Sequence, residues 1–319
     1  MDSAKVLVTG ASGYLGSSLS RAFRKAGFPT YGLTRDHGAA RLLERDEINP
    51  VVADVRDREA LREARDIGFD VIVSNTEDYG DPEGHYQAIR DMLEILTANR
   101  SGSERRKPLV MFTSGSKDYG NMDEVAGDPN LRPHTERSPV EPHPFAAARA
   151  RFAQALLDAP SPDYDITVLR PALMYGHAAG LFGLLFEHAA ASEDTISLKA
   201  RPRTVMHGVH VDDSAAAYVL LAKLADRSMI ASKSFNIANA EFETTQDIAA
   251  ALAAAYGKGL RFGEPDDDYS GFSAHLLANT SQWVDSTRIR QVAGWTDVMP
   301  GLAEGMPEYR RAYEASKLN

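Results

Sequence analysis

The chain has 319 residues, 43% of them hydrophobic and 25% charged, which is typical of a soluble globular protein with one large domain or two coupled lobes. Its net charge of −10 argues against binding to nucleic acid or to an anionic membrane, and the absence of cysteine excludes disulfides and thiolate metal sites. A strand-like run begins at residue 5, and no apolar stretch approaches the roughly 20 residues of a membrane span. We therefore expect a cytoplasmic protein with no membrane or nucleic-acid partner.

The first half of the chain alternates short apolar runs with amphipathic segments. The apolar runs predict strands at residues 5–10, 29–35, 50–55, 70–75, 108–114 and 165–171. The segments between them predict helices at residues 17–27, 38–48, 58–66, 85–99 and 146–157. Apolar strands separated by helices indicate parallel βαβ units with helices on both faces of one sheet. We therefore predict an α/β fold with a doubly wound, Rossmann-like parallel sheet and a smaller C-terminal substrate lobe.

The second half of the chain predicts how the two lobes share the sequence. The Rossmann-like core is expected to span residues 1–172 and to take back residues 205–240. Residues 173–204 and 241–319 are expected to form the smaller lobe, with a helix at residues 182–191. Segments rich in Pro, Gly and Asp predict loops at residues 117–144 and 263–271. The first of these loops follows the carboxyl end of a strand, where ligands of such sheets bind.

A glycine-rich turn lies between the first predicted strand and the first predicted helix. In "VTGASGYLG" the first glycine permits the tight turn, the second lets the backbone approach a pyrophosphate, and the third lets helix and strand pack closely. The alternative is a purely structural turn, but the strand–turn–helix context favours nucleotide binding. The candidate cofactor contacts are Gly10, Ser12, Gly13, Tyr14, Leu15 and Gly16.

The end of the second predicted strand indicates which dinucleotide is bound. An NAD site would place an acidic residue there for the ribose hydroxyls, whereas this chain has Thr34 followed by Arg35. A guanidinium suits a 2′-phosphate through charge-assisted hydrogen bonds, so NADP is the expected cofactor. The alternative is that Arg35 is solvated and Asp36 serves the ribose.

Several motifs together resemble the extended short-chain dehydrogenase/reductases, the family of nucleotide-sugar epimerases and dehydratases. They are "TGxxGxxG", "ADVRD", "FTSGSKDYG", "LRPALMYG", "HVDDSAAAY", "FNIAN" and the C-terminal "VDSTRIRQVAGW". The resemblance implies that Asp54 and Val55 flank the adenine, and that Asn75 and Thr76 lie along the ribose and pyrophosphate. It also implies that the nicotinamide is lined by Pro171, Ala172 and Leu173.

The catalytic positions of this family are changed in this chain. Most members carry a Ser or Thr after the fifth strand and a Tyr-x-x-x-Lys pair on the next helix, in which the lysine lowers the tyrosine pKa. Alignment through "DYG" places Gly115, Phe145 and Arg149 at these positions, and no tyrosine lies between Tyr119 and Tyr164 to restore the pair. Phe145 has no transferable proton, whereas Arg149 can still anchor the cofactor but cannot readily act as an acid.

Other residues could replace the missing proton donor. Lys117 and Tyr119 are the candidates beside Arg149 in the catalytic set, although a tyrosine in this motif more often packs structurally. Ser114 and Ser116 could hydrogen-bond a substrate carbonyl, and we assign Ser114 to the cofactor side and Ser116 to the substrate side. His143 could be a neutral-pH acid, although a solvated loop histidine is the simpler interpretation.

The second lobe supplies further candidate substrate contacts. Sugar-nucleotide enzymes of the family carry an arginine for the substrate diphosphate, and Arg203 lies near that position in the motif. Asp212 and Asp213 are more simply interpreted as caps of the following helix, after His210 in a buried strand. The histidine spacing does not predict a metal site. The candidate substrate contacts are Ser116, Phe145, Tyr175, His177, Arg203 and His207.

These features predict an atypical NADP-dependent oxidoreductase acting on a small organic carbonyl or enone-type substrate. The loss of a general acid typically costs 10²–10⁴-fold in rate, so hydride transfer would be slowed but not prevented. Two alternatives remain open. The protein could be a non-redox isomerase, cyclase or lyase that keeps NADP as a structural cofactor, using cations to stabilise developing charge. It could also be a non-catalytic NADP-binding sensor. A homodimer through helices 85–99 and 145–158 is plausible by resemblance.

Overall fold

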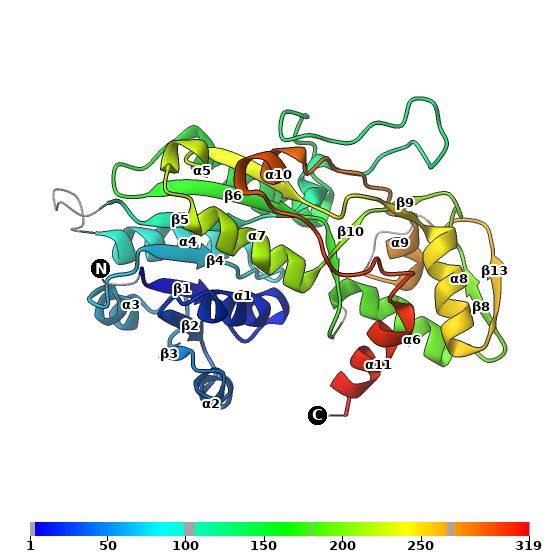
Figure 1. Ribbon diagram of the computed structural model, residues 1–319, viewed down its shortest axis with the longest axis horizontal. Coiled ribbons are helices and arrows are strands. Elements are labelled where there is room, and N and C mark those ends of the chain that lie inside the picture. The colour runs from blue at the N-terminus through cyan, green and yellow to red at the C-terminus, as the bar shows by residue number, and fades with distance from the viewer. Residues whose placement is uncertain (1–3, 99–105, 179, 267–270, 319) are drawn as a thin grey trace.

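A seven-stranded parallel sheet forms the centre of the protein in the computed structural model, which describes residues 4–98, 106–178, 180–266 and 271–318. The strand order is β11-β6-β5-β4-β1-β2-β3, with helices on both sides of the sheet (Figure 1). This order confirms the predicted doubly wound fold. The strands are β1 (Val6–Thr9), β2 (Thr30–Thr34), β3 (Asn49–Val52), β4 (Val71–Ser74), β5 (Leu109–Thr113), β6 (Asp165–Pro171) and β11 (Lys233–Ile237).

The alternation of apolar side chains along each strand supplies a separate core to each face of the sheet. Val6 and Val8 pack in one cluster with α1 and α7, whereas Leu7 between them packs in another cluster with α4 and α5. This is the period of two expected when successive strand residues point to opposite faces. The helices of this part are α1 (Tyr14–Lys25), α2 (His37–Arg45), α3 (Arg58–Arg65), α4 (Pro82–Thr97), α5 (Ala147–Asp158) and α7 (Val211–Lys223).

A third buried cluster is built from two-stranded ribbons and short helices at the other end of the molecule (Figure 1). The ribbons pair β7 (Leu173–Tyr175) with β10 (Gly208–His210), β9 (Val205–Met206) with β12 (Glu243–Thr244), and β8 (Thr195–Leu198) with β13 (Gly259–Phe262). The helices are α6 (Gly183–Ala191), α8 (Thr245–Tyr256), α9 (Ala274–Asn279), α10 (Thr287–Ala293) and α11 (Met306–Ser316). Short 3₁₀ segments complete the elements of the described ranges: η1 (Ser116–Tyr119), η2 (Pro144–Ala146), η3 (Gly180–Phe182) and η4 (Arg227–Met229).

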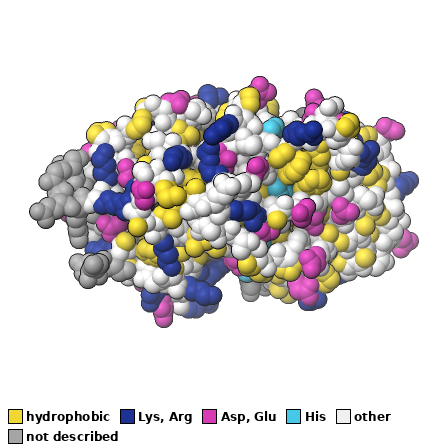
Figure 2. All heavy atoms as spheres, turned by 45° about the horizontal axis from the view of Figure 1, so that its top comes forward, with side chains coloured by type: hydrophobic (Ala, Val, Ile, Leu, Met, Phe, Trp, Pro, Cys, Tyr) yellow, Lys and Arg dark blue, Asp and Glu magenta, His cyan; other side chains and the backbone are white. Residues whose placement is uncertain are grey.

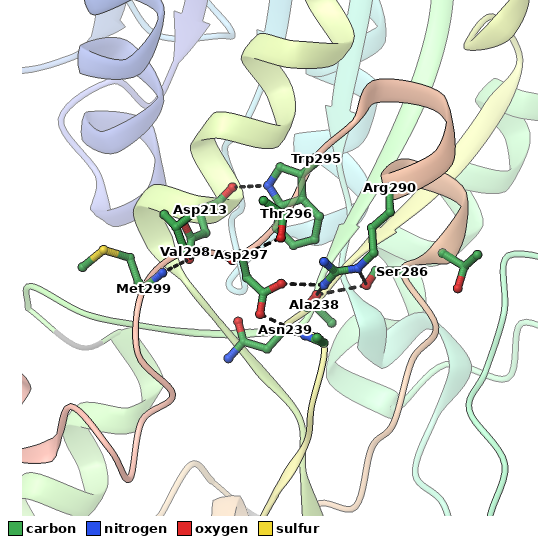
Figure 3. Close-up of polar contacts among 12 residues, drawn as sticks. Asp213, Ala238, Asn239, Ser286, Arg290, Trp295, Thr296, Asp297, Val298 and Met299 are labelled. Atoms are coloured by element: carbon green, nitrogen blue, oxygen red, sulfur yellow. Dashed lines mark hydrogen bonds and ion pairs between the residues drawn. The ribbon is translucent and has the colours of Figure 1, made fainter.

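The segment that follows α10 is anchored to the first turn of α7 (Figure 3). Asp213 Oδ2 accepts hydrogen bonds from the backbone amides of Val298 at 3.1 Å and Met299 at 2.9 Å. Trp295 Nε1 donates to the Asp213 carbonyl at 2.8 Å, and Trp295 belongs to the core cluster under α1 and α7. The C-terminal region therefore returns to the sheet before it continues to α11.

An ion pair strengthens the same connection. Arg290 Nη2 donates to Asp297 Oδ1 at 2.7 Å and to the carbonyl of Ala238 at 3.1 Å, and its guanidinium lies 4.7 Å from the ring centroid of Trp295 (Figure 3). Asp297 Oδ2 in turn accepts from the amide of Ala240 at 3.0 Å. Arg290 thus joins α10 to the chain just after β11.

The cap of α7 differs from the one that the sequence predicts. His210 Nδ1 accepts from the amide of Asp212 at 3.1 Å, so the histidine is the cap. Asp212 instead lies 2.8 Å from His177 Nε2, and Asp213 holds residues 298 and 299. Both carboxylates have distant partners, which local sequence spacing does not reveal.

Basic and acidic side chains are interspersed over the face shown in Figure 2. No helix within the described ranges is both long enough and apolar enough to span a membrane. Among the same residues, no group of three or more His, Asp or Glu side chains could hold a metal ion. The predicted loop at residues 263–271 lies partly outside the described residues.

Candidate functional site

The glycine-rich turn places the start of α1 beside the carboxyl ends of β1 and β4. A Cβ atom on Gly16 would lie 2.0 Å from the carbonyl oxygen of Gly10, so no larger residue allows this close approach of helix and turn. Gly13 precedes α1 without a side-chain cap, and the first turn of α1 contains no acidic residue. The amides in the first turn of α1 and the helix dipole therefore suit an anionic pyrophosphate.

A cavity of about 670 Å³ extends from this turn across the ends of β2, β3 and β4. Its volume lies in the range of cofactor sites. The structure brings most of the predicted cofactor contacts together here, whereas Gly16 packs behind the turn. The predicted residues that line the cavity are Gly10, Ser12, Gly13, Tyr14, Leu15, Arg35, Asp54, Val55, Asn75 and Thr76. The residues present fit a dinucleotide.

Arg35, directly after β2, places a guanidinium in the lining of this cavity. The side chain of Arg35 is 79% exposed, and its Nη1 lies 3.6 Å from Asp54 Oδ2. Asp36 caps α2, because its Oδ1 accepts from the amide of Gly38 at 2.7 Å. One carboxylate oxygen of Asp36 is therefore engaged with its own helix, while Asp36 also lines this cavity.

A second cavity of about 390 Å³ shares a wall with the first. Its lining contains the predicted Ser114, Ser116, Lys117, Phe145, Arg149 and Pro171–Leu173. The shared wall consists of Tyr14, Leu15, Asn75, Thr76, Glu77, Tyr79 and Met174. A ligand that crosses this wall can therefore contact both the turn and the changed catalytic positions.

Arg149 forms a bidentate ion pair with Glu77 in the second cavity. Arg149 Nη1 donates to Oε1 and Oε2 of Glu77 at 3.1 and 3.0 Å, and the two side chains are 12% and 25% exposed. Glu77 also accepts from the hydroxyls of Tyr79 at 3.0 Å and Tyr86 at 3.4 Å. Burial alone would lower the pKa of Arg149, but Glu77 and Asp118 raise it above its usual value. The guanidinium therefore stays charged.

Asp118 is a fully buried carboxylate beside this ion pair. Its Oδ2 accepts from Ser114 Oγ at 2.6 Å and from Arg170 Nε at 2.8 Å, while its Oδ1 lies 3.8 Å from Arg149 Nη2. Two arginines of β6 and α5 thus flank one carboxylate. The Ser114 hydroxyl lines the cavity but already has an acceptor, so its expected contact with a ligand competes with Asp118.

Gly115 makes room for Arg149 at the position where most family members carry a hydroxyl. A Cβ atom on Gly115 would lie 3.0 Å from Arg149 Nη2. Phe145 lines the cavity at the position of the usual tyrosine, and its ring centroid lies 4.4 Å from that of His143. His143 is 8% exposed rather than solvated, and burial lowers its pKa, helped by the charge of Lys117.

Lys117 is a buried amine in the lining of the second cavity. Its side chain sits in η1, the residue is 4% exposed, and its Nζ donates to the carbonyl of Thr280 at 3.4 Å. Burial lowers the pKa of Lys117 to about 7. The amine can therefore exchange a proton near neutral pH, which the sequence alone does not indicate.

Three predicted site residues are buried away from both cavities. Tyr119 donates to Asn236 Oδ1 at 2.9 Å, and burial raises its pKa. Tyr175 donates to the carbonyl of Pro300 at 2.9 Å. His207 Nε2 lies 3.0 Å from the carbonyl of Asn239, and burial lowers the pKa of His207 to about 4. Their polar atoms are bonded within the protein, so the structure does not bring them to a ligand.

Two more predicted substrate contacts lie outside the cavity lining. Arg203 Nε donates to the carbonyl of Ala126 at 2.6 Å, so Arg203 connects its own loop to the segment after η1. His177 pairs with Asp212 at 2.8 Å, and the hydrogen bond to this carboxylate raises the pKa of His177. This pair ties the loop after β7 to α7.

The site also contains residues that the sequence analysis does not single out. Glu77 is the partner of Arg149, and its position just after Asn75 and Thr76 at the carboxyl end of a parallel strand is the signal that could have found it. Phe272 lies 5.1 Å from Phe145 between ring centroids. No sequence signal links residues 145 and 272, because only the fold brings them together.

Part of the chain is similar in sequence to a known enzyme. A "4-hydroxy-2-methyl-3-oxo-4-farnesyl-3,4-dihydroquinoline-1-oxide ketoreductase" of Stigmatella aurantiaca is 28% identical over 178 residues. This match covers 54% of the chain and about half, 51%, of that enzyme.

Solved structures of sugar-nucleotide enzymes match nearly the whole chain. A UDP-glucose 4-epimerase from Stenotrophomonas maltophila with bound NAD has a TM-score of 0.76 at 20% identity and covers 99% of each chain. A dTDP-glucose 4,6-dehydratase from Bacillus anthracis has a TM-score of 0.74 at 14% identity, covering 99% of this chain and 98% of its own. These likenesses confirm the extended short-chain dehydrogenase/reductase fold.

Residues 6–238, which run from β1 to the end of β11, match the family described as "NAD dependent epimerase/dehydratase family". The match includes the glycine-rich turn, the ends of β2 to β6 and the changed catalytic positions. The chain therefore belongs to the NAD dependent epimerase/dehydratase family.

Proposed function

We propose that this protein is an NADP-dependent reductase of an organic carbonyl or enone-type substrate, with Lys117 as its proton donor. The observation that carries the proposal is the shared wall of the two cavities, because it lets a dinucleotide at the glycine-rich turn meet a substrate beside Lys117. When bound, the cofactor would supply a hydride.

The residues of the first cavity would bind and orient the cofactor. The amides at the start of α1 would hold the pyrophosphate, and Asp54 and Val55 would flank the adenine. Arg35 supports NADP, because a 2′-phosphate would form charge-assisted hydrogen bonds with a guanidinium that has only a 3.6 Å contact to Asp54. Pro171, Ala172 and Leu173 line the second cavity, where the nicotinamide would lie.

Lys117 would complete the reduction by giving one proton from Nζ. The proton would go to the oxygen of a carbonyl or to the α carbon of an enone, and it would balance the hydride that the bound cofactor would supply to the carbonyl carbon or the β carbon. A donor with a pKa near the working pH is the most effective general acid. Arg149 would position the substrate through its charge, while Glu77 holds the guanidinium in place.

The named activity of the Stigmatella aurantiaca relative supports a carbonyl substrate, since that protein is a ketoreductase. The family description supports a nicotinamide cofactor. The second candidate, a non-redox isomerase, cyclase or lyase, gains support from Phe145, which supplies no proton at the usual tyrosine position.

Absorbance of reduced nicotinamide tests the proposal directly. We expect the protein to oxidise NADPH in the presence of cinnamaldehyde, cyclohexenone or α-tetralone, with a rate that falls as the pH rises above about 7 and Lys117 loses its proton. Lys117→Met should lower kcat by about 10²–10⁴-fold. Lys223→Met, at an exposed position of α7, is the matched control.

Other outcomes would replace this proposal. Product formation without NADPH oxidation would favour the non-redox enzyme. A rise in melting temperature with NADPH, without turnover of any compound, would favour the sensor. An unchanged rate in Lys117→Met would show that Lys117 is not the proton donor, and it would not contradict the reductase activity.

A further inference from the structure

Tyr79 and Phe145 line the second cavity, Phe272 packs against both of them, and we call these three rings the aromatic mouth. The centroids of Phe145 and Phe272 are 5.1 Å apart with an interplanar angle of 62°. Those of Tyr79 and Phe272 are 6.3 Å apart at 64°. These edge-to-face arrangements leave ring faces that a further ring can contact. The three residues come from the loop after β4, from η2 and from the segment before α9, so the fold assembles them from distant parts of the chain.

Two rings of the aromatic mouth, those of Tyr79 and Phe272, are exposed to an unusual degree for large apolar side chains, and Phe145 is half-buried. Tyr79 is 58% exposed and Phe272 is 44% exposed, and Leu181 of the cavity lining is 37% exposed. An exposed apolar patch beside a cavity is a common sign of a ligand-binding surface. Tyr79 is also fixed in place, because its hydroxyl donates to Glu77 at 3.0 Å. The ring is therefore held while much of its surface stays free.

The charges around the cavity do not suit a diphosphate. Among the described lining residues the cations are Lys117 and Arg149, and Arg149 is already neutralised by Glu77. Arg203, the expected diphosphate contact, is bonded to Ala126 outside the cavity lining. Entry of two phosphate charges would require the Arg149–Glu77 pair to break or to accept the repulsion of the Glu77 carboxylate.

Part of the cavity wall is apolar. Pro171, Ala172, Leu173 and Met174 follow one another along the lining from the end of β6 into β7, and Leu181 adds to it. Met174 and Leu181 are not among the residues expected to line the nicotinamide, and they favour contact with a flat hydrocarbon face over contact with sugar hydroxyls, which need hydrogen-bond partners when they lose water. The lining and the aromatic mouth therefore both favour a flat, apolar ligand over a sugar.

We propose that the aromatic mouth selects planar, uncharged, conjugated bicyclic or larger ring systems as substrates and rejects sugar nucleotides. The inference deepens the proposed function, since it rests on that function for the view that the bound ring system is a substrate. Tyr79, Phe145 and Phe272 are then the specificity-determining residues. Their ring faces and edges would contact the substrate ring, while its carbonyl lies toward Lys117.

Calorimetric binding without turnover tests this proposal, using the full chain with and without saturating NADP⁺. The probes are β-naphthol, its saturated counterpart decahydro-β-naphthol, and UDP-glucose. We expect β-naphthol to bind at least about tenfold more tightly than either of the other two. Phe272→Leu should weaken β-naphthol binding about five- to tenfold, which corresponds to the typical worth of one aromatic contact, and should leave decahydro-β-naphthol unaffected.

Two further variants show whether the effect belongs to the ring. Phe272→Tyr keeps a ring and should keep the affinity for β-naphthol. Met229→Ala removes a side chain that is 38% exposed on η4, and should change neither affinity nor stability appreciably. If Phe272→Leu melts at a lower temperature, Tyr79→Leu provides the same test on a different segment.

Several results would overturn the proposal. Equal affinity for β-naphthol and its saturated counterpart would show that planarity is not selected. Tighter binding of UDP-glucose than of β-naphthol, or full affinity in both Phe272→Leu and Tyr79→Leu, would remove the role of the aromatic mouth. These are equilibrium binding measurements, so they do not depend on turnover. If the protein never oxidises NADPH, the proposed function is wrong, but the binding test of the aromatic mouth is still valid. An active reductase that prefers UDP-glucose would end only the inference.

Discussion

Arg149 and Glu77 face each other at the boundary of the two cavities, with Arg149 Nη1 at 3.1 and 3.0 Å from the two carboxylate oxygens of Glu77. The arginine stands where most family members have the catalytic lysine, and the glutamate follows directly on residues that line the nucleotide cavity. The site therefore contains a fixed ion pair in place of the lysine that lowers the tyrosine pKa in most family members.

We expect Glu77→Gln to lower the free energy of unfolding by about 1–3 kcal/mol, because it leaves the mostly buried charge of Arg149 with a weaker partner. Urea denaturation measures the change. Glu83→Gln is the matched control, since Glu83 pairs with Arg151 while both side chains are more than half exposed, and its loss should cost below about 1 kcal/mol. Equal costs for the two variants would mean that the Arg149–Glu77 pair is as weak as a surface pair.

Gly115 and Arg149 should behave as a coupled pair. Gly115→Ala would place a methyl group 3.0 Å from Arg149 Nη2, and we expect a cost of about 1–2 kcal/mol from crowding. In the background of Arg149→Lys the same change should cost less, because the lysine head is narrower. A double-mutant cycle measures this coupling. Gly263→Ala, whose new Cβ meets only a side-chain atom at 3.8 Å, should be neutral, and additive effects in the cycle would contradict the prediction.

The burial of Lys117 should make stability depend on pH. The pKa of Lys117 in the folded protein is about 7, below its usual value, so above pH 7 the unfolded chain binds more protons at this residue than the folded protein. The free energy of unfolding should then rise with pH from about 7, by at most about 1.4 kcal/mol per pH unit. Below pH 7 the buried amine of Lys117 is charged, and burial of this charge lowers the free energy of unfolding by its full amount.

Lys117→Met isolates this contribution, because it keeps a similar shape without the charge. We expect the variant to be more stable than the wild type below pH 7, and the difference to shrink as the pH rises toward 10. His134 and His143 also feel the charge of Lys117, since burial and this charge both lower their pKa values. Parallel stability curves for the two proteins would contradict the expected titration.

Arg35 should discriminate between the two nicotinamide dinucleotides. We expect Arg35→Ala to weaken NADPH binding by about 10- to 100-fold, the worth of a charge-assisted contact to the 2′-phosphate, and to leave NADH binding nearly unchanged. Fluorescence titration of both cofactors measures the ratio. Arg41→Ala, at an exposed position of α2, controls for the loss of positive charge. Equal weakening of NADPH and NADH would leave no role for Arg35 in selection.

Asp213 should matter more for stability than its neighbour. Asp213→Ala leaves the amides of Val298 and Met299 without their acceptor, and we expect a cost of about 1–3 kcal/mol together with faster proteolysis after α10. Asp212→Ala removes an exposed partner of His177 and should cost distinctly less. Thermal denaturation and limited trypsin digestion measure the two effects. A larger loss in Asp212→Ala would reverse our view of which carboxylate anchors the C-terminal segment.

The fold follows from local patterns, and so the sequence predicts it well. Each strand from β1 to β6 overlaps a predicted apolar run, although β3 begins one residue earlier, at Asn49, and the glycine-rich turn and the end of β4 line the same cavity as expected. These strands and this turn depend on residues that are close together in the sequence. The division into two lobes, the choice of NADP and the homodimer stay predictions.

The chemical end of the site is harder to predict, because long-range partners decide it. Tyr119 and His207 are plausible ligand contacts from sequence, but Asn236 and Asn239 bind their polar atoms inside the protein. In the same way, only the folded chain brings Phe272 to Phe145. The spacing of residues along the sequence does not predict hydrogen-bond partners that lie more than thirty residues away.

Tyr14 links the two cavities in one further way. Its ring lines both of them, and its hydroxyl donates to the carbonyl of Gly176 at 2.9 Å, in the loop that continues to Gly180 and Leu181 at the second cavity. A ligand bound at the glycine-rich turn would therefore contact a residue that also holds the loop beside the second cavity. We expect an ordered sequence of arrival, in which the dinucleotide enters first and the small molecule is retained only afterwards.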